Sequence, residues 1–135
     1  MSAKDKIHTP VKNALIKAGY TVTHNPYTLW YGSERVYIDM AAEWTSPPEH
    51  IIIIEVKSFV KASIIRDFED VLGQYIFYFG ILKLTQPKYK LYIAISDKTY
   101  SDIIQREMIN ITLQFHAIPL IIVDIDQEEI VKWIN

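Results

Sequence analysis

Apolar residues recur at three- and four-residue spacings in three parts of the chain, the pattern of a helix with one buried face. The first part spans residues 4–18 and stops before Gly19, a residue suited to a helix C-terminus. The second spans residues 63–84 and the third residues 100–116. We expect three helices, the last with one apolar side formed by Ile103, Ile104, Met108 and Ile111.

Segments rich in β-branched and aromatic residues lie between these helices and predict strands. Residues 20–24, 27–31 and 35–41 are separated by turn-forming pairs, which predicts an antiparallel meander. Residues 43–50 contain two prolines and predict a loop, and the isoleucine-rich segment 51–57 predicts a central buried strand. Segments 90–96 and 118–124 flank the last helix, so a parallel crossover is expected. The tail 128–134 fits an edge strand or a short helix, and we favour the strand.

The length of 135 residues, the absence of repeats and the hydrophobic fraction of 50% predict a single α/β domain over residues 1–135. Cysteine is absent, which excludes disulfides, zinc–thiolate sites and thiol nucleophiles and fits a reducing cytoplasm. The apolar runs are far shorter than the ~20 residues of a membrane helix. We therefore expect a soluble, cytoplasmic protein that does not bind membranes. The net charge of −2 gives no general signal for nucleic-acid binding.

One group of charged residues points to chemistry. Glu55 and Lys57 are two residues apart on the central strand, so both side chains face the same side of the sheet. Asp39 closes another strand-like segment, and a hairpin pairing of the two segments would bring it beside Glu55. Two carboxylates can hold Mg²⁺ or Mn²⁺, and a nearby lysine can orient or activate a water molecule. The three residues predict a metal-dependent phosphodiesterase site, with Asp39 and Glu55 as the metal ligands.

The alternative for Glu55 and Lys57 is a surface ion pair with little effect on stability. The spacing of fifteen residues between Asp39 and Glu55, each at the end of a hydrophobic strand, favours the site. Glu43 shares strand parity with Asp39 and is a candidate supporting carboxylate. Of the four histidines, His8 near the start of the first helix is a candidate for a metal or phosphate contact, although such a residue is more often a surface or capping residue.

The residues Asp39, Glu55 and Lys57 resemble the motif of the PD-(D/E)xK nuclease superfamily, with Ile38 where the motif name has proline. In the second helix, Gln74 and Tyr78 are similar to the Gln-x-x-x-Tyr element that follows the lysine in many of those nucleases. The resemblance implies a restriction-endonuclease-like, three-layer domain with a central mixed sheet flanked by helices. Many superfamily members carry an acidic residue on the first helix, and Asp5 is the candidate here.

Over nearly its whole length the chain also resembles the fdxN-element excision controlling factor (XisH) family. The similar segments are Ala3-Lys4-Asp5-x-x-His8, Thr23-His24-x-Pro26, Tyr37-Ile38-Asp39, Glu55-Val56-Lys57-Ser58-Phe59, Asp67-x-Glu69, Gly73-Gln74-Tyr75 and Leu91-Tyr92. The resemblance implies a role in programmed DNA excision, a site-specific recombination process of cyanobacteria. Two functions follow as hypotheses: an endonuclease, or an inactive regulator that binds DNA or the excision recombinase.

Self-association is a further expectation. Aromatic side chains are enriched at the cores of protein interfaces, and this chain has an aromatic surplus. We therefore predict a homodimer whose interface includes aromatic residues from Trp30, Tyr31, Tyr75, Phe77, Tyr78 and Phe79.

Overall fold

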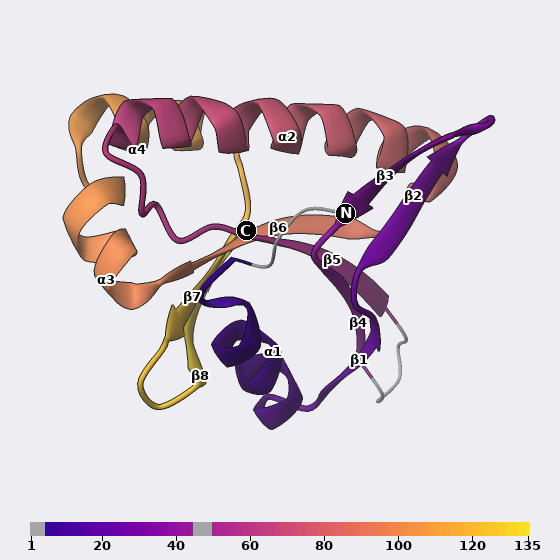
Figure 1. Cartoon of the computed structure of the whole chain (residues 1–135), viewed down its shortest axis with the longest axis horizontal. Coiled ribbons are helices and arrows are strands. Elements are labelled where there is room, and N and C mark those ends of the chain that lie inside the picture. The colour runs from indigo at the N-terminus through magenta and orange to yellow at the C-terminus, as the bar shows by residue number, and fades with distance from the viewer. Residues whose placement is uncertain (1–4, 45–49) are drawn as a thin grey trace.

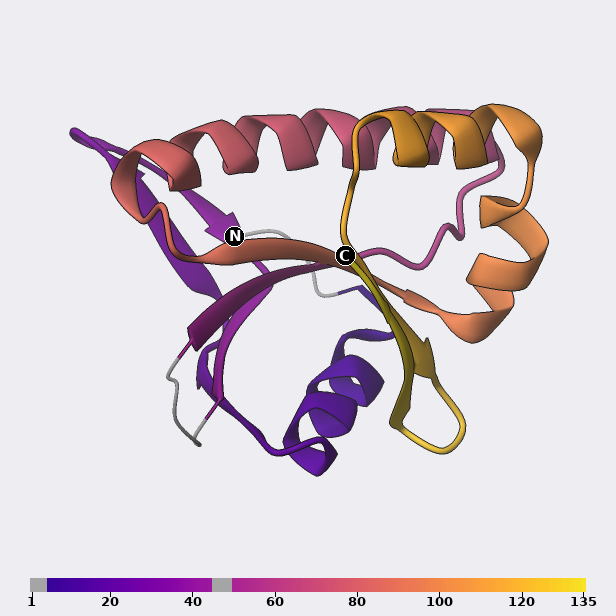
Figure 2. The same cartoon turned by 180° about the vertical axis from the view of Figure 1, so that it is seen from behind.

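The computed structural model describes residues 5–44 and 50–135, which form a mixed α/β fold. Six strands make one sheet in the order β1-β4-β5-β6-β7-β8, and β2 and β3 pair separately as a hairpin. Helices lie on both faces of the large sheet (Figures 1 and 2). The helices are α1 (His8–Lys17), α2 (Ile64–Thr85), α3 (Asp97–Thr99), the π-helical turn η1 (Tyr100–Ile104) and α4 (Glu107–Phe115). The strands are β1 (Tyr20–His24), β2 (Tyr27–Tyr31), β3 (Glu34–Ile38), β4 (Met40–Trp44), β5 (His50–Val56), β6 (Lys90–Ser96), β7 (Leu120–Asp124) and β8 (Glu129–Ile134).

Strand β5 lies inside the sheet, as its run of isoleucines predicts. It pairs antiparallel with β4 and parallel with β6, so both of its edges are hydrogen-bonded. Helix α2 makes the connection between β5 and β6. Strands β6 and β7 are also parallel, which confirms the expected strand, helix, strand unit. The C-terminal segment is a strand, β8, paired antiparallel with β7.

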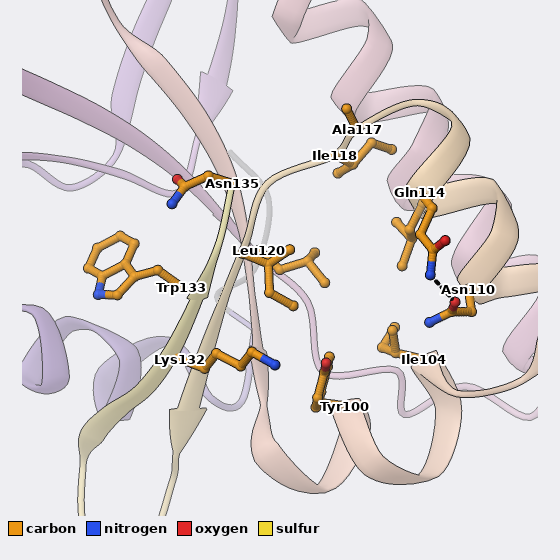
Figure 3. A pocket seen from close by; sticks show the side chains of 12 residues that line it. Tyr100, Ile104, Asn110, Gln114, Ala117, Ile118, Leu120, Lys132, Trp133 and Asn135 are labelled. Carbon is orange, nitrogen blue, oxygen red and sulfur yellow. Dashed lines mark hydrogen bonds between the residues drawn. The ribbon is translucent and has the colours of Figure 1, made fainter.

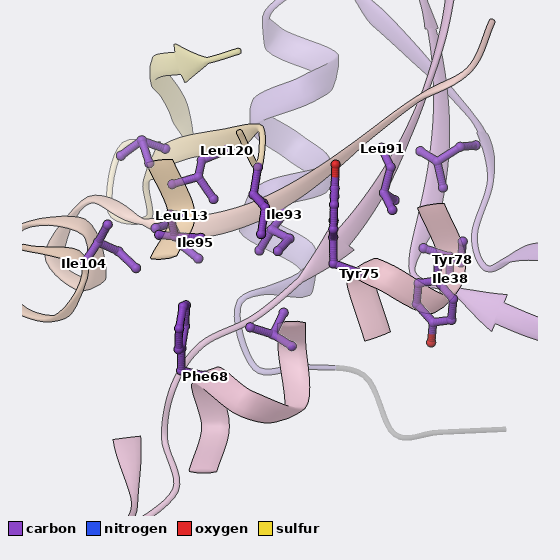
Figure 4. Packing of buried hydrophobic residues seen from close by; sticks show 14 of the residues in the cluster. Ile38, Phe68, Tyr75, Tyr78, Leu91, Ile93, Ile95, Ile104, Leu113 and Leu120 are labelled. Atoms are coloured by element: carbon purple, nitrogen blue, oxygen red, sulfur yellow. The ribbon is translucent and has the colours of Figure 1, made fainter. Parts of the chain in front are cut away.

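Alternate side chains of β5 enter two different cores. Ile52 and Ile54 face α1 and pack in one cluster with Val11 and Leu15. Ile53 faces the other side of the sheet, where Phe68, Tyr75 and Tyr78 of α2 and Leu113 of α4 close the larger cluster (Figure 4). The alternation of strand side chains therefore explains why this sheet is covered on both faces. No described helix is both long and apolar enough to cross a bilayer.

The predicted antiparallel meander is confirmed for the β2–β3 hairpin but is wrong for the first strand. Segment 35–41 is split by a bend at Asp39 into β3 and β4, which belong to different sheets. Strand β1 pairs with β4, whereas β2 pairs only with β3 in the described structure. The bend is stabilised by a long-range hydrogen bond from the backbone N–H of Val56 to Asp39, which no local pattern reports. The predicted loop 43–50 is shorter than expected at both ends, and residues 45–49 lie outside the described part of the chain.

The predicted third helix, over residues 100–116, is not continuous. Helical structure begins earlier, at Asp97, and is interrupted before α4 by Arg106, whose backbone is extended with ψ of 134°. The interruption changes the face that α4 presents to the sheet. Met108 and Ile111, expected on the apolar side, are 77% and 63% exposed, while Ile109 and Leu113 are buried.

The set of aromatic residues predicted to mediate self-association divides into two groups. Tyr75 and Tyr78 are buried in the core under α2 and are not available to a partner. The other four are exposed over at least two fifths of their surface: Trp30, Tyr31, Phe77 and Phe79.

Candidate functional site

Asp39 and Glu55 face each other at the end of the β4–β5 ladder. Met40 pairs with Ile54, and continuing this register by one residue places Asp39 opposite Glu55. The backbone N–H of Asp39 donates to Oε1 of Glu55 at 3.4 Å, and the N–H of Val56 donates to Oδ2 of Asp39 at 2.7 Å. The fifteen residues between Asp39 and Glu55 therefore form β4, the connection and most of β5, which brings the chain back to the same end of the ladder. The predicted convergence of these two carboxylates is present.

The two carboxylates strongly perturb each other. Burial, followed by the charge of Asp39 and a hydrogen bond to it, raises the pKa of Glu55 to about 9. Burial also raises the pKa of Asp39, and the hydrogen bonds from Val56 and Glu55 partly offset that effect. Burial and the mutual repulsion of the two acids therefore favour retention of a proton by the pair at neutral pH. Two acids that share a proton are a site at which a cation can take the place of that proton.

Lys57 lies immediately beyond β5 and is held by a second buried acid. Its Nζ lies 3.6 Å from Oδ1 of Asp67, and its charge lowers the pKa of Glu55. Asp67 lies in the first turn of α2 with 0% of its surface exposed. Its Oδ2 accepts the N–H of Lys61 at 3.0 Å, whereas Oδ1 has no hydrogen-bond partner. The ammonium group of Lys57 thus lies beside Asp67 and near enough to Glu55 to lower its pKa.

His8, the first residue of α1, approaches the site, and Asp5 lies near it before the helix begins, not on the helix as predicted. His8 is buried, and its Nδ1 lies 3.9 Å from Oδ1 of Asp39 and makes no hydrogen bond. Its Nε2 is 2.8 Å from Oδ1 of Asn25, which fixes the ring. Asp5 accepts the backbone N–H and the hydroxyl of Ser58 at 2.9 and 3.0 Å. Asp5 therefore ties the start of α1 to the segment after β5, and His8 is the residue of this helix that faces the carboxylates.

Gln74 and Tyr78 lie one helical turn apart on α2, on the side that faces the sheet. A side-chain hydrogen bond with Gln74 lowers the pKa of Tyr78, but burial and then the charge of Glu55 raise it to about 12. The hydroxyl of Tyr78 is therefore neutral and close enough to Glu55 and Asp39 to sense their charges. The predicted common face of these two residues is present.

Glu43 is not brought to the carboxylate pair. It pairs with Ile51 across the β4–β5 ladder, four positions along β5 from Glu55, or about 13 Å at the rise of a strand. It lines a shallow pocket with His50, Lys88 and Tyr89 instead. The bend at Asp39 does not alter this, since the separation is set by the strand itself.

Two residues of the site were missed by sequence analysis. Asp67 could have been noticed because it lies four residues before Val71 and eight before Tyr75, at a buried position of the apolar face of α2. An aspartate at such a position requires a partner. Asn25 carries no such signal, since its contact with His8 spans seventeen residues and depends on the turn between β1 and β2.

No group of three or more histidine, aspartate or glutamate side chains is placed to hold a metal ion within residues 5–44 and 50–135. A cation at the carboxylate pair would therefore have two carboxylate groups from the protein. A cavity of about 510 Å³ lies elsewhere, between η1, α4 and β8 (Figure 3). Lys132 and Tyr100 line this cavity together with residues of the C-terminal strand, and none of the predicted site residues reaches it.

A mixed sheet with helices on both faces, and an acid pair beside a lysine at the end of an interior strand, define an α/β protein with a buried acidic site. The family model described as "XisH protein" matches residues 1–131. The chain belongs to the XisH family, as the sequence resemblance predicted.

Two solved structures agree with this assignment. An XisH family protein from Nostoc punctiforme PCC 73102 is 36% identical, with a TM-score of 0.89 over 97% of this chain and 100% of that one. An fdxN element excision controlling factor protein from Anabaena variabilis is 34% identical, with a TM-score of 0.88 over 98% of this chain and 100% of that one. No curated protein matches the chain.

Proposed function

We propose that this protein is a metal-dependent, endonuclease-like protein of the PD-(D/E)xK type, with a restriction-endonuclease-like domain, that acts in or controls programmed DNA excision. The observation that carries the proposal is the buried pair of Asp39 and Glu55 with Lys57 beside it. A member of the same family is named an excision controlling factor, which supports the process proposed here. DNA and an excision recombinase are the proposed partners.

Asp39 and Glu55 fit a divalent cation. Both carboxyl groups are buried, their pKa values are raised, and their oxygens lie at the end of two paired strands. Mg²⁺ commonly takes one or two carboxylates and fills its remaining positions with water and phosphate oxygens, so two acids suffice. When bound, Mg²⁺ or Mn²⁺ would supply Lewis-acid stabilisation of a phosphodiester and a water of lowered pKa.

The other residues of the site would position the phosphodiester and stabilise the negative charge that develops on it. Lys57 is held by Asp67, so its ammonium group presents a fixed positive charge toward the place where a phosphate would bind near Glu55. Such a charge stabilises the negative charge that develops on a phosphodiester during hydrolysis. Gln74 and the neutral Tyr78 offer polar groups on the same side of the sheet, and His8 faces Asp39 from α1. Each has a role that can be tested separately from the metal ligands.

Nicking of supercoiled and branched DNA in Mg²⁺ or Mn²⁺ tests the proposal. We expect metal-dependent cleavage that Lys57→Met removes and that Lys61→Met retains. Lys61 is the matched control because it is an exposed lysine paired with Asp70 at 3.6 Å, four residues from Lys57. If the wild-type protein and Lys57→Met give the same result on every DNA form, the catalytic function is wrong.

A regulator without catalytic activity is the second candidate. The lack of a third acid at the pair within the described residues, together with the pI of about 6.1, favours it. This protein would bind DNA or the recombinase through another surface. DNA association that weakens with salt and is unchanged by Asp39→Ala or Glu55→Ala would support it, because the phosphate contacts would then lie elsewhere.

A further inference from the structure

The outer surface of the helical layer is unusually apolar. On the side of α2 that faces away from the sheet, Ile76, Phe77 and Leu84 are 58%, 55% and 72% exposed. Helix α4 covers the same face of the sheet and exposes three apolar residues at positions i, i+3 and i+7. They are Met108, Ile111 and Phe115, which are 77%, 63% and 82% exposed.

The apolar area is large for a monomer. Six large side chains, each exposed over more than half of its surface, present on the order of 600 Å². The largest apolar patch of a typical monomer covers about 300–600 Å² and is often a binding surface. Two such surfaces in contact would bury about 1,200 Å², which reaches the range of specific protein complexes. We refer to the exposed residues of α2 and α4 as the outer helical face.

Two glycines lie on the exposed side of α2, on either side of Ile76 and Phe77 in the sequence. Gly73 and Gly80 are seven residues apart, so they lie two turns apart on one side of α2. A Cβ added at either position would meet nothing within 4 Å. Since a glycine inside an exposed helix lowers its stability and the chain itself does not require one here, the two positions suit close approach by another backbone.

We propose that the outer helical face is covered by a second copy of this chain, with the two α2 helices antiparallel. A twofold axis between Ile76 and Phe77 would place Gly73 opposite Gly80 of the partner subunit. The missing side chains would let the helices come close, so that Ile76 packs on Phe77 of the partner subunit. The helix is thus complementary to itself, as a twofold interface requires.

The charges on α2 select the antiparallel direction. Glu69 and Asp70 lie in its N-terminal half, and Lys83 lies near its C-terminus. Within the described residues, Lys83 lies 5.4 Å from the centre of the Phe79 ring and forms no ion pair. An antiparallel partner would place its Glu69 and Asp70 beside this lysine, although within one chain these acids pair with Arg66 and Lys61. A parallel pairing would bring like charges together instead. This dimer does not depend on the proposed nuclease activity.

A single cysteine tests the geometry, because the natural chain has none. We expect Ile76→Cys to form a disulfide-linked dimer under mild oxidation, since the axis passes beside this position. Ile16→Cys is the matched control: it is an isoleucine on helix α1, 50% exposed, and should remain a monomer on a non-reducing gel. Equal cross-linking of both variants would overturn the proposal.

Charge reversal and mass give an independent test. Light scattering of the wild-type protein should give twice 15.8 kDa at micromolar concentration. Lys83→Glu should raise the dimer dissociation constant about tenfold, because a twofold interface contains the pair twice, and adding Glu69→Lys should restore it. Circular dichroism checks that each variant is folded. A monomeric wild-type mass would overturn the proposal. A mass that increases only when another protein is added would overturn it as well.

Discussion

The N–H of Asp39 and the carboxyl group of Glu55 lie 3.4 Å apart across the end of the β4–β5 ladder, at positions that face each other in the strand register. This relationship makes the two acids one unit that titrates together. A substitution of either residue therefore alters the pKa of the other.

Metal binding should release a proton. At pH 7, Glu55 is protonated, since its pKa is about 9, and it must ionise to accept a divalent cation. We expect release of about one proton per Mn²⁺ bound, measured by calorimetry in two buffers of different ionisation enthalpy. Glu43→Gln, which lies on the neighbouring strand away from the pair, should leave the release unchanged. Binding of Mn²⁺ with no proton released would contradict the prediction.

Stability should fall as pH rises from 5 to 9. An unfolded glutamate ionises near its ordinary value of 4.5, whereas Glu55 in the folded protein ionises near 9. Between these values the folded state binds more protons, so the free energy of unfolding decreases by about 1.4 kcal/mol per pH unit. Urea unfolding between pH 6 and pH 8 measures this slope, and Glu55→Gln should flatten it. Equal slopes in both proteins would show that Glu55 is not the group responsible.

Removing Asp67 should be much more destabilising than removing its exposed neighbour. Asp67→Ala leaves Lys57 half-buried without its partner and frees the N–H of Lys61, so a loss of about 3 kcal/mol is expected. Asp70→Ala breaks an exposed pair with Lys61 and should cost less than about 1 kcal/mol. Urea unfolding of the two variants gives the comparison. Similar losses would mean that Asp67 does not hold Lys57 in solution.

Two glycines should respond to alanine in opposite ways. Gly19 has φ of +103°, and an added Cβ would lie 3.0 Å from the ring of Trp44, so Gly19→Ala should cost more than about 1 kcal/mol. Gly73 lies inside α2 with open space around it, so Gly73→Ala should stabilise the isolated subunit by about 0.5–1 kcal/mol. Unfolding at concentrations low enough to avoid association measures both effects. Stabilisation by Gly19→Ala would contradict the first expectation.

Sequence patterns predicted the elements whose burial is periodic. The isoleucines of β5 and the apolar stripe of α2 report burial directly, because the spacing of apolar side chains matches the geometry of each element. The carboxylate pair was also predictable, since a hairpin brings the two strand ends together. The bend at Asp39 and the break at Arg106 were not, because each depends on contacts or backbone angles that leave no repeating pattern. Asp67 was missed although its place on the apolar face of α2 marks it as a buried acid.

The protonation of Glu55 changes how the molecule meets a polyanion. The formal charge of −2 counts every glutamate as ionised, so a neutral Glu55 at pH 7 leaves the chain one unit less negative. Around the pair, the charges of Lys57 and Asp67 cancel, whereas Asp5 adds a negative charge that raises the pKa of Asp39. Exchange of one proton for a dication would make this group of side chains one charge unit more positive. A polyanion such as the proposed DNA partner would therefore meet weaker repulsion after the exchange than before it.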